Sequence, residues 1–128
     1  MIGLDTTAVI DLFRGDPGMK KFLEKNKEPL ATSMLNYLEI HFGIDPEVDQ
    51  EEADYYEQFF HDTYFLDLTG QACRRASALH WSLRKKGKPI GKFDCVIAAC
   101  LLENGVKKIL TRNKKHFQHI DGIQVISY

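Results

Sequence analysis

The residues best suited to chemistry in this chain are carboxylates that stand close to the ends of short apolar runs. Asp5 directly follows the run Met1–Leu4, which is typical of a buried strand. Glu39 lies early in the helix expected after a second short strand at 29–32. Because open α/β sheets bind ligands at the carboxyl ends of their strands, we expect both carboxylates at that edge.

Asp94 and Asn113 add two further oxygen-bearing side chains. Asn113 lies just past the expected strand 108–111, and Asp94 joins the others if the apolar helix 96–102 enters from the same edge. Carboxylates at ~4 Å from one another repel by roughly 1 kcal/mol in water and roughly 4 kcal/mol at an effective dielectric constant of about 20. A hard divalent cation removes this conflict, because Mg²⁺ prefers oxygen ligands, and it can also activate a water molecule against a phosphodiester.

Each of these residues also has a purely structural interpretation. Asp5 and Asn113 are good helix N-caps, Asp94 suits the positive end of a helix dipole, and Glu39 could be an ordinary exposed residue. Taken one at a time, capping is the simpler interpretation. Only their expected meeting at one edge of a sheet predicts a metal site.

Short apolar strands alternate with amphipathic helices along the chain, and this pattern favours a parallel sheet covered by helices. Strands are expected at 1–4, 29–32, 63–68, 108–111 and 123–126. Helices are expected over 8–13, 19–23, 34–42, 69–86, 96–102 and 113–117, with one more beginning at Asp45. The sequence therefore predicts a single α/β domain over 1–128, a three-layer α/β/α sandwich around a mainly parallel sheet of roughly five strands.

Two of these helices carry specific predictions about burial. The helix over 34–42 presents one apolar face, made of Leu35, Leu38 and Phe42. The helix that begins at Asp45, with Pro46 at its first position, is expected to turn four side chains inward: Val48, Tyr55, Phe59 and Phe60.

Charge is distributed unevenly along the chain, although the net charge is only −1. Residues 1–69 hold 5 Lys and Arg against 15 Asp and Glu, a net of −10, whereas residues 70–128 hold 12 against 3, a net of +9. This asymmetry predicts a basic side suited to phosphates, with a merely solvated face as the alternative. Lys92 and Arg112 directly precede the region of Asp94 and Asn113, and by hypothesis they contact a phosphate backbone there.

Several other classes of site are disfavoured. The three cysteines are odd in number and lack Cys-x-x-Cys spacing, which favours a reduced, cytoplasmic protein. Since there is no signal peptide and no apolar run of about 18 residues, no membrane association is expected. His116 and His119 lie three residues apart without a third His or Cys ligand, and they are interpreted as surface residues.

Four segments stand out when they are considered together: 4–12 (LDTTAVIDL), 33–39 (SMLNYLE), 93–99 (FDCVIAA) and 111–117 (TRNKKHF). The segment 4–12 resembles the opening of PIN-domain proteins, in particular the VapC-type toxins of bacterial and archaeal toxin–antitoxin pairs. The segment 33–39 resembles their second acidic motif, 93–99 is similar to their D-x-x-I-A-A signature, and 111–117 resembles their last motif. The resemblance runs in order through the whole chain.

This resemblance implies an endoribonuclease that depends on Mg²⁺ or Mn²⁺ and hydrolyses RNA phosphodiester bonds. Asp5, Glu39 and Asp94 would be the carboxylates that bind the metal. Asn113 stands where family members carry Asp or Asn. Its neutral amide cannot act as a base, so one firmly bound metal is favoured over two.

The resemblance also implies supporting residues and partners. Thr6 and Thr111 match hydroxyls that are frequent in the family and are expected to support the carboxylates, while Lys92 and Arg112 would contact the RNA backbone. A cognate antitoxin and a homodimer are implied as well. Two alternatives stay open: a housekeeping PIN-domain nuclease that processes RNA, and a catalytically silent PIN module that binds RNA or protein as a scaffold.

Overall fold

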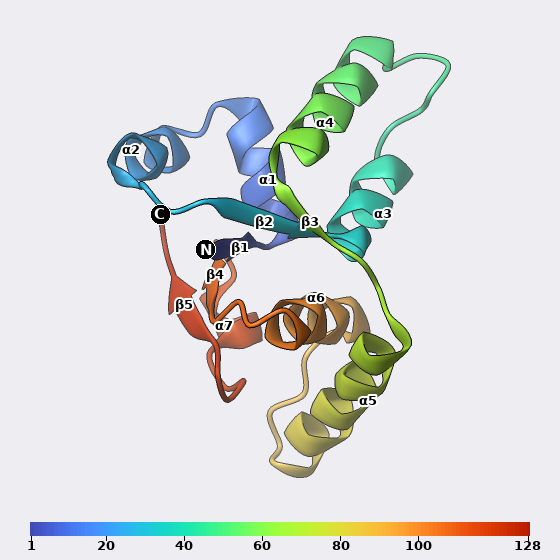
Figure 1. The fold of residues 1–128 in the computed structure, drawn as a ribbon, viewed down its shortest axis with the longest axis vertical. Coiled ribbons are helices and arrows are strands. Elements are labelled where there is room, and N and C mark those ends of the chain that lie inside the picture. Colours follow the sequence, from blue (N-terminus) through green and yellow to red (C-terminus); the bar gives the residue numbers. More distant parts are fainter.

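A computed structural model describes all residues of the chain, 1–128 (Figure 1). Its centre is a sheet of five strands in the order β3-β2-β1-β4-β5, in which every neighbouring pair is parallel. The strands are β1 (Ile2–Leu4), β2 (Leu30–Ser33), β3 (Tyr64–Leu66), β4 (Lys108–Leu110) and β5 (Gln124–Ile126). The parallel α/β sheet predicted from the sequence is confirmed.

Helices cover both faces of this sheet. Figure 1 shows one side covered by α1 (Thr6–Arg14), α2 (Pro17–Lys25), α3 (Met34–Phe42) and α4 (Gln50–Asp62). The other side carries α5 (Gly70–Lys85), α6 (Lys92–Glu103) and α7 (Lys114–Phe117). This is the expected three-layer arrangement. No helix combines the length and the apolar character that crossing a membrane requires.

Each face of the sheet has its own apolar core, because successive residues of a strand point to opposite faces. Leu4 of β1 packs in one core together with Phe60 of α4. Ile109 of β4 packs in the other core together with Ile97 of α6. The sheet is therefore buried on both sides, which leaves the ends of its strands as the places where polar groups can gather.

The strand order reverses between β1 and β4. From β1 the chain adds β2 and β3 on one side and then crosses back to add β4 and β5 on the other. In open α/β sheets the ligand crevice lies at the carboxyl ends of the strands, at such a switch point. Asp5 directly follows β1 and Thr111 directly follows β4, so both residues lie at this position.

Gly3 allows α6 to lie close to the central strand. A Cβ atom at Gly3 would stand only 2.3 Å from Cδ2 of Leu101 on α6, so the position has no room for a side chain. The absence of a side chain at Gly3 therefore lets Leu101 of α6 pack against β1. Asp94 lies in the first turn of the same helix.

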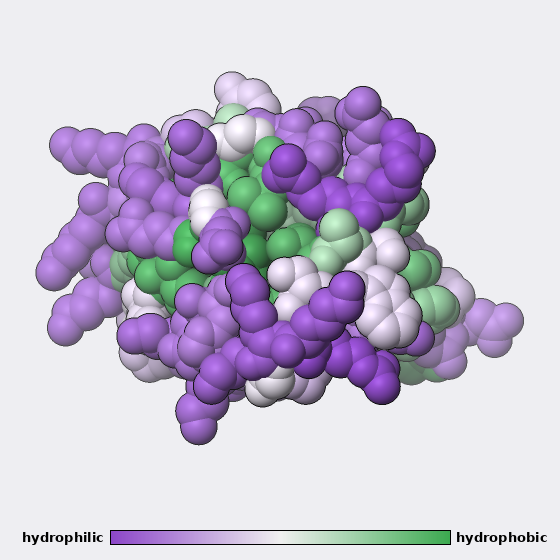
Figure 2. Space-filling model, turned by 90° about the horizontal axis from the view of Figure 1, so that it is seen from below, coloured by the Kyte–Doolittle hydropathy of each residue, from purple (hydrophilic) through white to green (hydrophobic).

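The acidic and basic halves of the sequence become separate layers in the fold. Helices α1–α4 all fall within residues 1–69, whereas α5–α7 fall within 70–128. Figure 2 views the molecule from below the orientation of Figure 1, on the side of α5, and shows apolar side chains surrounded by hydrophilic ones. Summed over its helices, the layer of α1–α4 is net acidic and the layer of α5–α7 is net basic, although α2 is itself basic and α6 has one more acidic than basic residue.

The helix predicted to begin at Asp45 begins instead at Gln50. Residues 46–48 form a turn, in which the Asp45 carboxylate accepts a hydrogen bond of 2.9 Å from the backbone N–H of Glu47. An Asp that bonds the backbone two residues ahead stabilises a turn and not a helix start. Val48, predicted to point inward, is consequently 76% exposed.

Burial along α3 corrects a second prediction. Leu35 is buried, but Leu38 and Phe42 are exposed. The buried side of α3 is completed by Asn36 and Ile40. Apolar residues occur all around this helix, so their spacing does not select one face, and a polar residue takes part in the buried one.

Burial along α4 agrees with the prediction at Phe59 and Phe60 and differs at Tyr55 as well as at Val48. Phe60 is buried and Phe59 half-buried, whereas Tyr55 is exposed. Tyr56 is buried in its place. Tyr56 and Phe60 are four residues apart and share one face of the helix, which leaves Tyr55 on its flank.

Candidate active site

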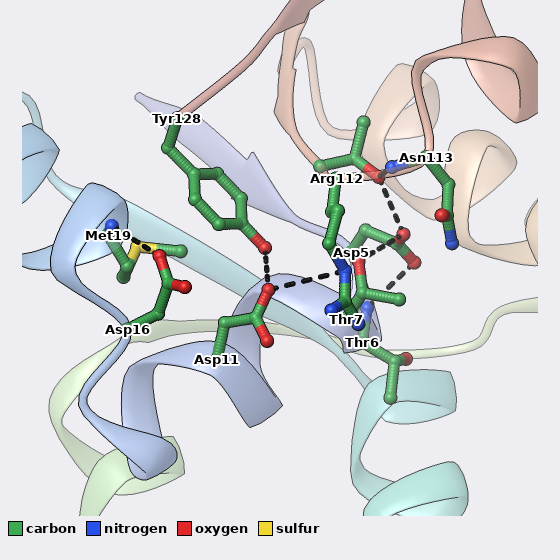
Figure 3. A network of polar contacts seen from close by, with 10 residues as sticks. Asp5, Thr6, Thr7, Asp11, Asp16, Met19, Arg112, Asn113 and Tyr128 are labelled. Carbon is green, nitrogen blue, oxygen red and sulfur yellow. Dashed lines mark hydrogen bonds and ion pairs between the residues drawn. The ribbon is translucent and has the colours of Figure 1, made fainter.

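Asp5 lies at the centre of a polar network at the switch point of the sheet (Figure 3). Its carboxylate is 3% exposed and accepts a hydrogen bond of 2.7 Å from the backbone N–H of Thr6, which makes it the N-cap of α1. It also accepts hydrogen bonds from the hydroxyls of Thr7, at 3.0 Å, and Thr111, at 2.8 Å. Asp5 therefore caps α1 as expected, but the cap uses only Oδ1 of its carboxylate, and Oδ2 accepts from the two hydroxyls.

Glu39 is joined to the same network through Thr6. The Thr6 hydroxyl donates to Oε1 of Glu39 at 2.6 Å and accepts from the amide Nδ2 of Asn36 at 3.0 Å. Asn36 is fully buried, and its Oδ1 accepts from the backbone N–H of Ser33 at 2.8 Å. This chain of bonds connects the end of β2 to the start of α1 and fixes Glu39 near Asp5.

Asp94 reaches the site from the opposite layer of helices. Its Oδ2 lies 2.9 Å from Nδ1 of His116, which forms an ion pair when the imidazole is protonated. The Asp94 side chain is 20% exposed and that of His116 is 50% exposed. The expected entry of α6 from the carboxyl edge of the sheet brings Asp94 into electrostatic range of Asp5.

The three carboxylates influence one another. Burial raises the pKa of Glu39, and the charges of Asp5 and Asp94 raise it further, while the hydrogen bond from Thr6 opposes this. Burial also raises the pKa of Asp94, together with the charge of Asp5, and His116 opposes the rise. Negative charge is thus concentrated at one point with no Lys or Arg among its neutralising contacts.

This cluster contains side chains that could bind a metal ion, but their oxygen atoms do not converge on one point. As they stand, no three Asp, Glu, His or Cys side chains come closely enough together to hold a metal ion. Hydroxyl groups and His116 occupy the carboxylate oxygens instead. The donors nevertheless fit a hard cation, since the carboxylates supply oxygens. Burial raises the pKa of Glu39 and Asp94, mutual repulsion raises it further, and a cation relieves this repulsion.

Asn113 stands beside this cluster in a half-buried position. It precedes α7 as the N-cap residue, but its side chain makes no capping hydrogen bond. Its backbone N–H instead donates to the hydroxyl of Thr111 at 2.9 Å. Thr111 therefore links the backbone of Asn113 to the carboxylate of Asp5, and the Asn113 amide is left available to a ligand.

The two cations expected to contact a phosphate backbone are both exposed. Lys92 is the first residue of α6, two positions before Asp94. Arg112 lies between Thr111 and Asn113, and its Nε is 3.5 Å from Oδ2 of Asp11 (Figure 3). Neither cation forms an ion pair with Asp5, Glu39 or Asp94.

Residues 2–123 match the family model of the PIN domain. The chain belongs to the PIN-domain family. It is 25% identical over 124 residues to the tRNA(fMet)-specific endonuclease VapC of Salmonella typhimurium, a match that covers 95% of this chain and 93% of the relative. The resemblance to PIN-domain proteins of the VapC type is thereby confirmed.

Solved structures agree with this PIN-domain fold. DNA-bound VapBC from Salmonella typhimurium matches with a TM-score of 0.82 at 22% identity, over 98% of this chain and 96% of that chain. VapBC-1 from nontypeable Haemophilus influenzae matches with a TM-score of 0.80 at 26% identity, over 99% of this chain and 98% of that chain.

Three residues of this PIN domain were not predicted from the sequence as part of the site. His116, interpreted as a surface residue, contacts Asp94, and no spacing signal predicts that contact. Asp11 is 5% exposed and pairs with Arg112. Asn36 has a detectable signal, because it lies three residues after Ser33 and both halves of a capping box form.

Proposed function

We propose that this PIN-domain protein is a Mg²⁺-dependent endoribonuclease and the toxin of a toxin–antitoxin pair. The observation that carries the proposal is that Thr6 donates hydrogen bonds to both Asp5 and Glu39 at the switch point of a PIN-domain sheet, with Asp94 in electrostatic range of both. None of the three carboxylates is paired with Lys or Arg. Such a cluster has a chemical use when a cation joins it, and PIN-domain relatives include a named endonuclease.

In this proposal Asp5, Glu39 and Asp94 hold Mg²⁺ or Mn²⁺. When bound, the metal supplies an activated water and offsets the charge that develops on the phosphodiester. Thr6 and Thr111 fix the rotamers of Glu39 and Asp5 through their hydroxyl groups.

Asn113 contributes a neutral amide that binds either the substrate or a water molecule. It cannot remove a proton. Asn113 therefore contributes by binding and orientation.

Lys92 and Arg112 are proposed to bind the phosphates of the RNA backbone on either side of the scissile bond. Both are exposed, both stand within two residues of a candidate site residue in the sequence, and both belong to the basic half of the chain. Phosphate contacts of this kind position a substrate and carry no sequence information.

We infer two protein partners, a cognate antitoxin and a second copy of this chain. The Salmonella and Haemophilus structures are VapBC assemblies, which supports a protein partner for this chain as well. The exposed apolar side chains of α3, Leu38 and Phe42, support burial against another surface. The proposed site of action is the cytoplasm, where RNA is present and the three free cysteines stay reduced.

The activity is tested by incubating a mixed RNA pool with the protein in Mg²⁺ or in EDTA and mapping the new ends to single nucleotides. We expect discrete cuts in Mg²⁺ only, and their loss in Asp94→Asn. Asp121→Asn is the matched control, because the side chain of Asp121 is 98% exposed. Full cleavage by Asp94→Asn would refute the metal site, and RNA binding without cleavage in Mg²⁺ or Mn²⁺ would favour the scaffold alternative.

The toxin role is tested separately in cells. Induced expression of the wild-type chain is expected to stop growth, while expression of Asp94→Asn is not. If the wild-type chain cleaves RNA in vitro but leaves growth unchanged, the housekeeping nuclease becomes the better description.

A further inference from the structure

A hollow of about 390 Å³ lies between α5 and α6, next to the start of α6. Ala76, Cys95 and Val96 form apolar walls, and Trp81 and Lys92 stand among the lining residues. The mechanism described above uses none of this space.

Trp81 is the only tryptophan of the chain, and 52% of its surface is exposed although its ring is large and apolar. The guanidinium carbon of Arg84 lies 5.6 Å from the centroid of its ring, and the His80 ring packs against it at a centroid distance of 5.3 Å. An indole held at the surface next to a guanidinium offers a flat apolar face beside positive charge.

The chemistry of this hollow favours a nucleotide over an apolar peptide. A nucleobase has a flat face that stacks on an aromatic ring, and it is attached to a phosphate that a nearby cation can bind. Lys92 and Arg84 provide such cations, and both belong to the half of the chain with a net charge of +9. An apolar peptide segment would match the walls but not these charges.

The position of the hollow relates it to the acidic cluster. Lys92 lines the hollow and is the first residue of α6, while Asp94 follows two residues later on a different side of that helix. A helix is about 10–12 Å across with its side chains, so the two side chains are separated by about the width of α6, and the RNA strand would have to cross the first turn of that helix to reach both.

We propose that the hollow binds a nucleobase of the RNA substrate, stacked on Trp81, with the adjoining phosphate on Lys92. This inference rests on the proposed ribonuclease function and assigns part of its substrate-binding surface. Stacking of this type accepts every base, so the hollow increases the affinity for RNA and fixes the position of the strand without a strict sequence requirement.

The first test uses the fluorescence of Trp81, which reports on this hollow without interference from another tryptophan. The whole protein is titrated in EDTA with a fluorescently labelled single-stranded oligoribonucleotide of mixed sequence, and with inorganic polyphosphate as a probe that has charge but no bases. We expect saturable quenching with RNA and none with polyphosphate. If the anisotropy of the labelled RNA reports binding while the Trp81 emission stays unchanged, the base binds elsewhere and the proposal is wrong.

The second test fills the hollow from its rim. Ser77 lines the hollow and is exposed, so Ser77→Phe blocks the space with little effect on folding. Ser82→Phe, on the same helix and exposed outside the lining, is the matched control. We expect Ser77→Phe and Trp81→Ala to raise KM for RNA by about tenfold with kcat nearly unchanged, and Trp81→Phe to retain most of the affinity.

The outcomes separate this inference from the proposed function. Wild-type KM in both Ser77→Phe and Trp81→Ala would overturn the nucleobase site while leaving the ribonuclease intact. Absence of Mg²⁺-dependent cleavage by the wild-type protein would instead refute the proposed function itself.

Discussion

At Asp5 the carboxylate accepts hydrogen bonds from the hydroxyls of Thr7 and Thr111, and at Glu39 it accepts one from Thr6. Neutral donors fix the rotamer of a carboxylate and leave its charge in place, whereas a Lys or Arg at the same distance would pair with that charge. The network therefore orients negative charge without neutralising it, which is the state that a cation-binding site requires.

We predict that Thr6→Val lowers both stability and cleavage. The variant keeps the shape of the side chain but leaves the buried amide of Asn36 and the carboxylate of Glu39 without their shared partner. A buried group without a partner costs roughly 1–3 kcal/mol, which urea unfolding will measure. Thr6→Ser restores the hydroxyl and is expected to recover most of the loss; if it behaves like Thr6→Val, the hydroxyl is not the cause.

We also predict that the stability of the metal-free protein depends on pH through Glu39 and Asp94. Burial, and then the charges of neighbouring carboxylates, raise the pKa of both groups in the folded chain. The folded chain therefore holds these protons more tightly than the unfolded chain, in which carboxyl groups titrate near pH ~4. The stabilising contribution is fully present below that pH and is lost as the pH rises through the raised, folded values.

Thermal unfolding in EDTA, compared between the wild type and Glu39→Gln across this pH range, isolates the contribution of Glu39. Mg²⁺ competes with protons for the same oxygens, so it should raise Tm more at about pH 7 than at about pH 5. A Mg²⁺-induced rise in Tm that is equal at both values would contradict the assignment.

Among the elements, two identical dipeptides show what local sequence can predict. Asp16-Pro17 begins α2, with the Asp16 carboxylate accepting from the backbone N–H of Met19 at 2.9 Å, whereas Asp45-Pro46 begins only a turn. Met19 is 1% exposed, but Val48, at the equivalent position, is 76% exposed. The same start signal becomes a helix where its first turn can bury an apolar side chain, and this depends on tertiary structure.

The residues of the candidate site likewise fall into two groups, those whose positions local sequence can predict and those whose positions depend on tertiary structure. The positions of Asp5 and Asp94 could be predicted because Asp5 follows a strand and Asp94 lies in the first turn of a helix, whereas Glu39 lies beyond the middle of α3 and is joined to Asp5 through Thr6. The contact of His116 with Asp94 depends on how the short helix α7 packs beside α6, so no periodic pattern reveals it. The parallel sheet was likewise predictable from alternation, but the buried face of α3 was not.

We predict that Gly3→Ala destabilises the fold by crowding the side chain of Leu101, which packs against β1. The added Cβ would stand 2.3 Å from Leu101, and overpacking of this kind costs about 1–3 kcal/mol. Gly70→Ala is the matched control, because a Cβ there meets only Arg74 at an ordinary 3.6 Å and alanine favours the helix. Urea unfolding of the two variants measures the difference in their free energies of unfolding. Equal stability would show that the packing around Gly3 adjusts without cost.

At the scale of the whole molecule, the candidate site lies between a helical layer that is net acidic, α1–α4, and a helical layer that is net basic, α5–α7. This layout predicts RNA binding that weakens as salt rises, because bound phosphates release counterions. Lys92→Ala and Arg112→Ala should each reduce the slope of log K against log salt by about 0.7 for single-stranded RNA. Lys21→Ala, an exposed change in the acidic layer, should leave the slope unchanged, and a reduction there would argue against a localised phosphate track.

The bond between Thr111 and Asp5 joins residues that are 106 positions apart, and β4 must be inserted beside β1 before it can form. During synthesis on the ribosome the amino-terminal segment emerges first, and it lacks β4, Thr111 and Asp94 for most of that time. An unfinished chain therefore carries no complete acidic cluster. We therefore expect nuclease activity to appear only after the last strands of the chain have joined the sheet.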